Sequence, residues 1–196
     1  HTRFRNVTGV QTCALPIYDE VMNEQRKVIY ARRQQIIDGG DLHEETIEAI
    51  SEAVEAIVEA NCAGAYAEDW DTEELVLQMQ ALFDSKMTQD EVRACDSIKS
   101  LRAAYLDEAL AAYAAKEEAI GSEQLREIER RVMLSVIDQH WREHLYEMDY
   151  LREGINLRAM GQRDPLAEWQ REGFDMFEAM MGSIRDNFVQ YVSRLE

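Results

Sequence analysis

The chain has 196 residues and a formal net charge of −18 at pH 7. This acidity excludes the usual nucleic-acid-binding proteins, because phosphate binding needs clustered lysine and arginine. No run approaches about eighteen uncharged apolar residues, so the sequence predicts no transmembrane segment. Glycine and proline are sparse and strong helix formers dominate, which predicts an all-α fold.

Residues 1–17 are treated apart from the rest of the chain. Within them, residues 7–17 read VTGVQTCALPI, which resembles the in-frame translation of a DNA-sequencing adapter. We interpret the segment as a disordered artefact rather than as a natural extension, and exclude it from fold reasoning. It does not resemble a signal peptide either, since Thr8 and Gln11 interrupt its apolar residues.

Two helices are predicted next. The first runs from Tyr18 to about Ile37, where apolar residues recur at helical spacing. The sequence DGGD at residues 38–41 ends it, because glycine is common directly after a helix. The second runs from Leu42 to about Ala60, with apolar residues on one face and glutamates largely on the other.

An acidic module occupies the middle of the chain. Residues 38–120 contain 21 acidic and 5 basic side chains, a net charge of −16, which is more typical of a solubilising surface than of a recognition site. Beyond the second helix we expect a loop at residues 61–71 with a buried Trp70, and a short helix over residues 72–82. The sequence TQDE at residues 88–91 predicts a capping box that opens a longer helix to about Ala114.

Two amphipathic stretches near the C-terminus predict a helical hairpin. We expect Ser122 to cap the first helix, Asp164 to cap the second, and Pro165 to be the second helix's first residue. The turn over residues 157–165 is short enough to fold the helices back on each other. The two apolar stripes should then pack together; they are Leu134, Ile137, Trp141, Leu145, Met148, Leu151 and Ile155, and Phe174, Phe177, Met181, Ile184, Phe188, Tyr191 and Leu195.

Few residues suggest chemistry. His140 to His144 read HWREH, which fits the H-x-x-E-H pattern of one class of zinc proteases. Catalytic zinc needs a third protein ligand, and the only other histidine after residue 17 is His43, in the acidic module. We therefore expect His140 and His144 to have a structural role and to bind no metal. The alternative is a zinc hydrolase in which both histidines bind zinc. Cys62 and Cys95 lack metal-ligand spacing and predict free thiols.

Two blocks of sequence resemble SecA, the family of motor ATPases of bacterial protein secretion. One is HWREHLYEMDYLREGINLR followed by AMGQRDPLAEWQREGF, residues 140–174, and the other is YDEVMNEQRKVIYARR, residues 18–33. The blocks stand in the family's order. The resemblance covers the chain from about Tyr18 to Glu196 and corresponds only to the C-terminal part of SecA.

The resemblance implies a helical scaffold at residues 18–40, a helical wing domain at residues 41–117, and a scaffold with a two-helix finger at residues 118–196. No phosphate loop of the form GxxxxGK[ST] occurs in the chain, so we expect it to be no enzyme and to hold no cofactor. ATP and Mg²⁺ would belong to nucleotide-binding domains of the parent protein. The partners would be those nucleotide-binding domains, a preprotein-binding domain of the same protein, a SecY-type channel complex and preproteins. The parent protein would be located in the cytoplasm and peripherally at the cytoplasmic face of the plasma membrane.

The resemblance also places the finger tip at residues 157–165. Arg158, Met160, Gln162 and Arg163 are the candidate contacts with channel and preprotein. Methionine is flexible and polarizable, which suits contact with varied apolar segments. The family often has tyrosine where this chain has Met160, so an apolar contact is kept and ring stacking is lost. Without the resemblance we would interpret these residues as an ordinary solvated turn. The alternative function is that of a freestanding adaptor that binds another protein through its helical hairpin.

Overall fold

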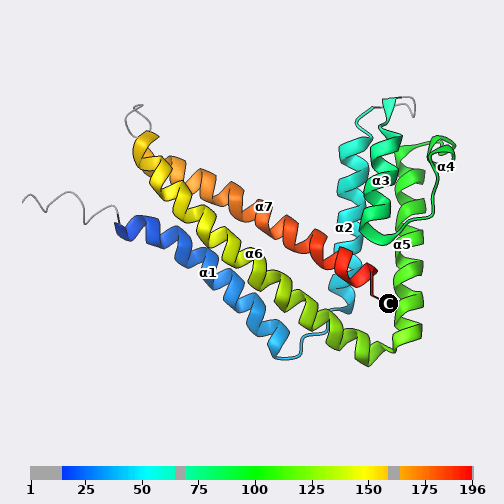
Figure 1. Cartoon of the computed structure of the whole chain (residues 1–196), viewed down its shortest axis with the longest axis horizontal. Helices are drawn as coiled ribbons and strands as arrows, with labels where there is room; N and C mark the ends of the chain where they lie inside the picture. The colour runs from blue at the N-terminus through cyan, green and yellow to red at the C-terminus, as the bar shows by residue number, and fades with distance from the viewer. Residues whose placement is uncertain (1–14, 65–68, 159–163, 196) are drawn as a thin grey trace, which may run out of the picture. The chain divides into compact units, whose positions relative to one another are not determined.

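The computed structural model describes residues 15–64, 69–158 and 164–195, and the regular elements within these ranges are helical (Figure 1). They are seven helices: α1 Leu15–Ile37, α2 His43–Asn61, α3 Thr72–Phe83, α4 Gln89–Arg93, α5 Ile98–Ile120, α6 Ser122–Arg158 and α7 Pro165–Ser193. The prediction of an all-α fold is confirmed. In the described part of the chain, no helix is both long and apolar enough to cross a membrane.

The contacts between residues divide the chain into two compact units, which are described separately. Of the described residues, 15–35, 137–158 and 164–182 form the first unit, which contains most of α1, the C-terminal part of α6 and most of α7. Residues 36–136 and 183–196 form the second, which contains α2 to α5 and the remaining parts of α6 and α7. The whole predicted wing, residues 41–117, therefore lies in the second unit.

Helix α1 begins at Leu15 rather than at Tyr18, so the last residues of the segment that we set aside are helical. It ends at Ile37 as predicted. Gly39 follows with a φ of 89°, a left-handed conformation that glycine adopts without a steric penalty. The Gly39 amide donates to the Ile36 carbonyl at 3.2 Å and closes the helix end.

Helix α2 forms the centre of the wing core, because it packs against both α3 and α5. The core residues with no exposed surface include Val54, Val58, Leu75, Met79, Leu101 and Tyr105. Trp70 is buried, as predicted, and its Nε1 donates to the Gly64 carbonyl at 3.0 Å. Trp70 is thus held by packing in the core and by a hydrogen bond to Gly64.

The predicted capping box is present, but the helix that it opens is short. Thr88 and Glu91 cap each other at the start of α4, which ends at Arg93. A second capping box, made by Ser97 and Ser100, then starts α5. The prediction of one long helix to Ala114 is therefore wrong. The Ser97 backbone is extended, and its side chain accepts from the Ser100 amide at 3.2 Å, so local hydrogen bonds interrupt the helix.

Helix α5 continues to Ile120, where Gly121 turns the chain with a φ of 96°. Ser122 is the first residue of α6, and Gly121 takes the position before it, so Ser122 does not cap the helix as we expected. The Leu125 amide donates to the Gly121 carbonyl at 2.9 Å and starts the helical hydrogen bonds.

The apolar stripe of α6 is close to the prediction, whereas that of α7 is not. In α6 the buried members are Ile137, Trp141, Met148 and Ile155. In α7, Ile184 and Phe188 are buried, but Phe174, Met181 and Tyr191 are 62%, 36% and 56% exposed. The buried residues are instead Trp169, Gly173, Met180, Val189 and Val192. The buried face of α7 thus agrees with the predicted one at Ile184 and Phe188 and differs from it toward both ends of the helix.

Candidate functional site

The parts of α6 and α7 that lead to the predicted finger tip belong to the first unit, where they run beside α1 (Figure 1). Of the four candidate contact residues, Met160, Gln162 and Arg163 fall outside the described residues. Arg158 is the last residue of α6, and its side chain also falls outside them. The structure therefore describes the two helices that carry the tip and the contacts that hold them.

Helix α7 starts directly after the tip, in the way that the sequence predicts. The Asp164 side chain accepts a hydrogen bond from the Leu166 amide at 3.0 Å, and its carbonyl accepts one from the Glu168 amide at 3.2 Å. Pro165 is the first residue of the helix, where the missing N–H costs nothing. The first turn of α7 is therefore capped by hydrogen bonds between residues that are close in sequence.

An apolar cluster holds the three helices together next to the tip. Its buried members are Met148 and Ile155 of α6 and Trp169 of α7, which are 2%, 0% and 1% exposed. Four partly buried residues pack against them, and these are Val21, Met22, Leu151 and Met176. Because α1 supplies two of the four, the finger is packed onto α1 as well as onto itself.

A buried chain of hydrogen bonds links the same three helices. The Gln25 Nε2 in α1 donates to the Gly173 carbonyl in α7 at 2.9 Å. The Gln25 Oε1 lies 2.9 Å from the Nε2 of His144 in α6. A carbonyl can only accept, so the amide nitrogen of Gln25 must face Gly173 and its oxygen must face His144. The proton of His144 therefore sits on Nε2.

The surroundings of His144 favour a neutral imidazole. The side chain is 1% exposed, and its ring stacks on Trp141 at 5.6 Å between centroids and meets the edge of Phe177 at 5.8 Å. Burial lowers the pKa of His144, because the charged form loses its hydration. The Nδ1 atom is buried and has no hydrogen-bond partner among the described residues, so a second proton there would be unsatisfied.

The contacts of His140 and His144 are relevant to whether the H-x-x-E-H pattern could bind zinc. The His144 Nε2 is engaged by Gln25 in the interior, and the His140 Nδ1 lies 3.8 Å from Glu143 Oε2 on the same helix. Within the described ranges, no three His, Cys, Asp or Glu side chains are grouped so that they could hold a metal ion. The arrangement explains His144 as a packing and hydrogen-bonding residue.

Gly173 lies where α7 approaches its neighbours closely. A Cβ atom at this position would lie 2.9 Å from the Met148 Cε and 3.6 Å from the Val21 Cγ1. The backbone of α7 therefore comes close to both α6 and α1 at Gly173, and the neighbouring Phe174 is left facing outward. Hydrophobic periodicity cannot find this point, because the residue at the closest approach has no side chain.

A charged pair adds a link between α1 and α6. The Arg33 Nη2 donates to Asp138 Oδ2 at 3.0 Å, and Arg33 Nε lies 2.7 Å from Asp138 Oδ1. Both side chains are partly buried, with 32% and 45% of their surface exposed, so solvent screens the pair less than a fully exposed one. The pair therefore adds to the hydrogen bonds of Gln25 with Gly173 and His144, which we call the Gln25 clamp, in holding α1 against α6.

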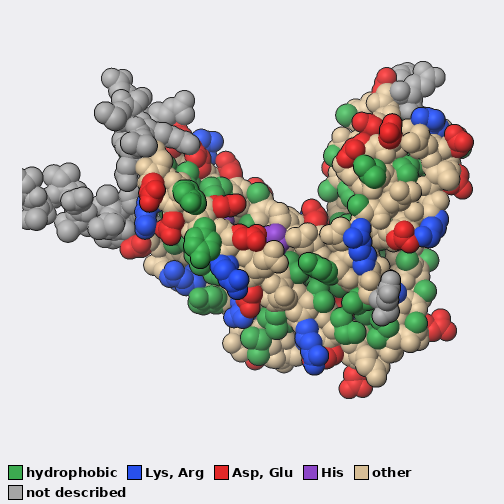
Figure 2. Space-filling model, viewed as in Figure 1, with side chains coloured by type: hydrophobic (Ala, Val, Ile, Leu, Met, Phe, Trp, Pro, Cys, Tyr) green, Lys and Arg blue, Asp and Glu red, His purple; other side chains and the backbone are tan. Residues whose placement is uncertain are grey.

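Elsewhere the charged side chains lie mostly on the surface. On the face drawn in Figure 2, acidic and basic side chains are interspersed. In the second unit, Arg102 of α5 lies 2.5 Å from Glu55 and 3.4 Å from Glu59 of α2. Part of the wing's acidity is thus balanced by ion pairs between its own helices, which fits a solvated surface better than a recognition site.

Sequence comparisons identify the family. Residues 14–196 match the SecA Wing and Scaffold domain. The protein translocase subunit SecA of Streptomyces coelicolor is 48% identical over 185 residues, which cover 91% of this chain and 20% of that protein. SecA proteins of Renibacterium salmoninarum and Pseudarthrobacter chlorophenolicus are 48% and 44% identical with the same coverage. The chain thus spans about a fifth of the length of these relatives. Since the matched residues include all seven described helices, the chain belongs to the SecA wing and scaffold domain family.

Proposed function

We propose that this chain is the coupling part of an ATP-driven preprotein translocase of the SecA type. The observation that carries the proposal is the family match from residue 14 to residue 196, which includes both helices of the finger and the helix that supports them. The chain itself would bind no nucleotide. ATP and Mg²⁺ would bind to other domains of the parent protein, and movements there would reach the finger through α1.

The supports of the finger suit a part that transmits movement. Helix α1 contacts the finger through the apolar cluster, the Gln25 clamp and the pair between Arg33 and Asp138. Buried hydrogen bonds and close packing resist sliding of α1 along α6 and α7, because such a movement would have to break these contacts together. A displacement of α1 would therefore carry both finger helices with it and move the tip.

The partners follow from the same proposal. The tip residues Arg158, Met160, Gln162 and Arg163 would contact a SecY-type channel complex and the preprotein within it. The parent protein would work in the cytoplasm and peripherally at the cytoplasmic face of the plasma membrane. A flexible apolar side chain at Met160 would contact segments of different sequence without selecting one.

The proposed role of the tip can be tested by replacing single tip residues in a full-length protein that contains this chain. Met160→Ala should slow preprotein translocation into membrane vesicles and leave basal ATP hydrolysis largely intact. Replacing Arg158 with glycine should do the same. The matched control is Met181→Ala, because this partly exposed methionine lies on α7 away from the tip.

The control should translocate at the wild-type rate. Met160→Ala should also change the free energy of unfolding by less than about 0.5 kcal/mol, because the role proposed for Met160 is contact with partners and not packing within the chain. Wild-type translocation rates in both tip variants would contradict the proposed role of the tip and leave the family assignment standing.

A further inference from the structure

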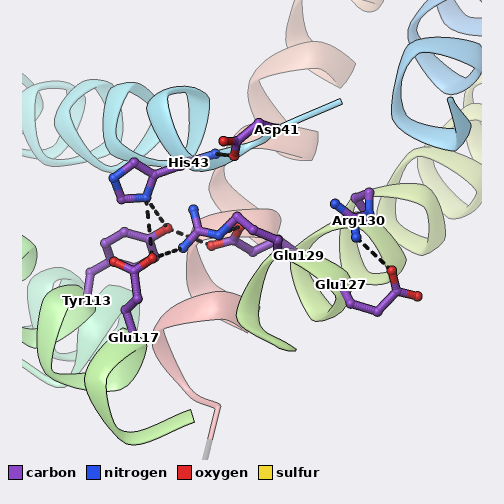
Figure 3. Close-up of polar contacts among 8 residues, drawn as sticks. Asp41, His43, Tyr113, Glu117, Glu127, Glu129 and Arg130 are labelled. Atoms are coloured by element: carbon purple, nitrogen blue, oxygen red, sulfur yellow. Dashed lines mark hydrogen bonds and ion pairs between the residues drawn. The ribbon is translucent and has the colours of Figure 1, made fainter. Parts of the chain in front are cut away.

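A partly buried cluster of polar and charged side chains lies in the second unit and includes none of the contacts described above for α1. It joins three helices: His43 comes from α2, Tyr113 and Glu117 from α5, and Arg126 and Glu129 from α6 (Figure 3). The Glu129 carboxyl has no exposed surface, and the Arg126 side chain is 11% exposed. A charge buried this deeply is costly unless it is well paired, so its partners decide what the cluster does.

A chain of hydrogen bonds connects Glu129 to the surface. The Tyr113 hydroxyl donates to Glu129 Oε1 at 2.7 Å. Because the hydroxyl has a single proton, the Tyr113 oxygen is then the acceptor for His43 Nδ1 at 3.3 Å. The His43 side chain is 36% exposed. A proton can therefore pass between solvent and the buried carboxyl without unfolding of the helices.

The charges of the cluster do not balance. Arg126 Nη2 donates to Glu117 Oε1 at 2.9 Å, so its strongest contact is with the outer carboxylate. Its Nε lies 3.3 Å from Glu129 Oε2, but the two are not aligned for a hydrogen bond, and Oε2 has no hydrogen-bond partner among the described residues. One guanidinium thus faces two carboxylates. With both ionised, one negative charge is left uncompensated.

The other charged groups around the cluster have partners of their own. Asp41 Oδ1 accepts the backbone amide of His43 at 2.9 Å, beside α2. On α6, Glu127 and Arg130 pair with each other at 2.8 Å, away from Glu129 (Figure 3). His43 lies 3.9 Å from Glu117, so a protonated imidazole would compensate the outer carboxylate rather than the buried one.

We propose that this cluster is a proton-binding site. Glu129 exchanges its proton with solvent through Tyr113 and His43, and a proton on Glu129 removes the uncompensated charge that lies between α5 and α6. The attachment of α2 and α5, which belong to the predicted wing, to the start of α6 is therefore strongest in the protonated state. The inference concerns this chain alone and does not depend on the proposed role in translocation.

The direction of the pH dependence follows from the surroundings of Glu129. Burial raises the pKa of Glu129, and it outweighs the hydrogen bond from Tyr113 and the nearby Arg126 charge, which act in the opposite direction. A raised pKa means that the folded state holds its proton more tightly than the unfolded state does. The stabilisation is therefore complete below the ordinary glutamate pKa and is lost as the pH rises through the raised pKa.

The direct test is a titration of the ¹³C-labelled glutamate side chains of the whole chain, followed by NMR. The carboxyl of Glu129 should titrate at a higher pH than the exposed glutamates. Glu127 on the same helix is the internal reference, since hydrogen bonds from Arg130 and Arg131 lower its pKa. A Glu129 midpoint equal to or below that of the exposed glutamates would overturn the proposal, and this measurement needs no variant.

A variant separates proton binding from a purely structural role. Tyr113→Phe removes a donor that favours the ionised carboxylate, so the Glu129 midpoint should move to higher pH. The matched control is Tyr191→Phe, whose exposed hydroxyl is on α7 and should leave the midpoint unchanged. If Tyr113→Phe lowers the unfolding midpoint but does not shift the Glu129 titration, then Tyr113 only packs and the proposed proton path is wrong.

A second variant tests the link to stability. The difference in unfolding midpoint between wild type and Glu129→Gln should change with pH above the ordinary glutamate range, because only the wild type loses its proton there. For Glu127→Gln the difference should change only in acid, where the lowered pKa of Glu127 matters. Two differences that are both constant above that range would contradict the proposal.

Discussion

Single side chains in the interior of the finger determine how its helices pack on α1. His144, Gln25 and Gly173 form one continuous chain of hydrogen bonds, and Trp141 and Phe177 enclose the imidazole. Each contact is short and buried, so each should be visible as a change in stability.

Trp141 should contribute the largest packing energy of these residues. Its side chain is buried, with 7% exposed, and it stacks on His144. Trp141→Ala should lower the free energy of unfolding by about 3–5 kcal/mol, because it removes apolar area and leaves a cavity. Tyr150→Ala on the same helix is the control, since Tyr150 is 77% exposed and should cost less than about 0.5 kcal/mol. Urea denaturation of both variants checks the difference, and equal costs would show that the Trp141 ring is not buried.

His144 should make the stability sensitive to acid. Burial lowers the pKa of His144, so the folded state disfavours the protonated form. The stability that it contributes is therefore complete above the ordinary histidine pKa and is lost as the pH falls below it. Denaturation at a series of pH values should show the difference between wild type and His144→Gln shrinking on acidification. A difference that is constant from neutral pH to about pH 5 would mean that His144 is not held neutral.

At the scale of helices, the sequence predicted some helix boundaries correctly and some buried faces only in part. Some helix starts and ends with local hydrogen bonds were predicted well, such as Asp164 and Pro165 at α7 and Gly39 after α1. The start of α5 at Ser97 was missed, and Ser122 does not cap α6. The face of α7 was predicted correctly at Ile184 and Phe188 and wrongly at Phe174, Met181 and Tyr191, because the pattern offers two overlapping stripes. Gly173 decides between them by allowing close contact, and glycine adds nothing to a hydrophobic pattern.

Glycines in α7 provide a prediction at this scale. A Cβ at Gly182 would meet nothing within 4 Å, so Gly182→Ala should stabilise the chain by about 0.5–1 kcal/mol through better helix propensity. Gly173→Ala should gain less or lose stability, because its Cβ would meet the Met148 Cε at 2.9 Å and displace it. Thermal unfolding of the two variants compares them directly. If Gly173→Ala is as stabilising as Gly182→Ala, then α7 does not approach its neighbours closely at Gly173.

Buried polar residues were the part of the site that sequence reasoning missed. Neither Gln25 nor Glu129 was given a role in the predictions made from the sequence. A signal for Glu129 exists, since it stands one helical turn after Leu125 and one before Met133, both of which are buried. A glutamate on an apolar stripe indicates a buried partner, but its identity, here Tyr113 on another helix, depends on the tertiary structure.

At the scale of the whole molecule, composition and periodicity were enough for the all-α class, and the motif resemblance was enough for the family. Neither could show how the finger is held, because the clamp joins residues 25, 144 and 173 from three separate helices. The tip residues Arg158, Met160, Gln162 and Arg163 rest on the resemblance alone, since packing in the described helices does not bear on their contacts.

We propose above all that this chain couples ATP hydrolysis to preprotein movement in its parent protein. The most direct measurement is ATP-dependent translocation by a chimera, in which residues 18–196 replace the matching segment of SecA from Streptomyces coelicolor, which is 48% identical. We predict that the chimera translocates preprotein into vesicles at a substantial fraction of the parent's rate, and that Gln25→Ala in the chimera lowers this rate more than it lowers basal ATP hydrolysis. A chimera that folds and hydrolyses ATP but moves no preprotein would contradict the account.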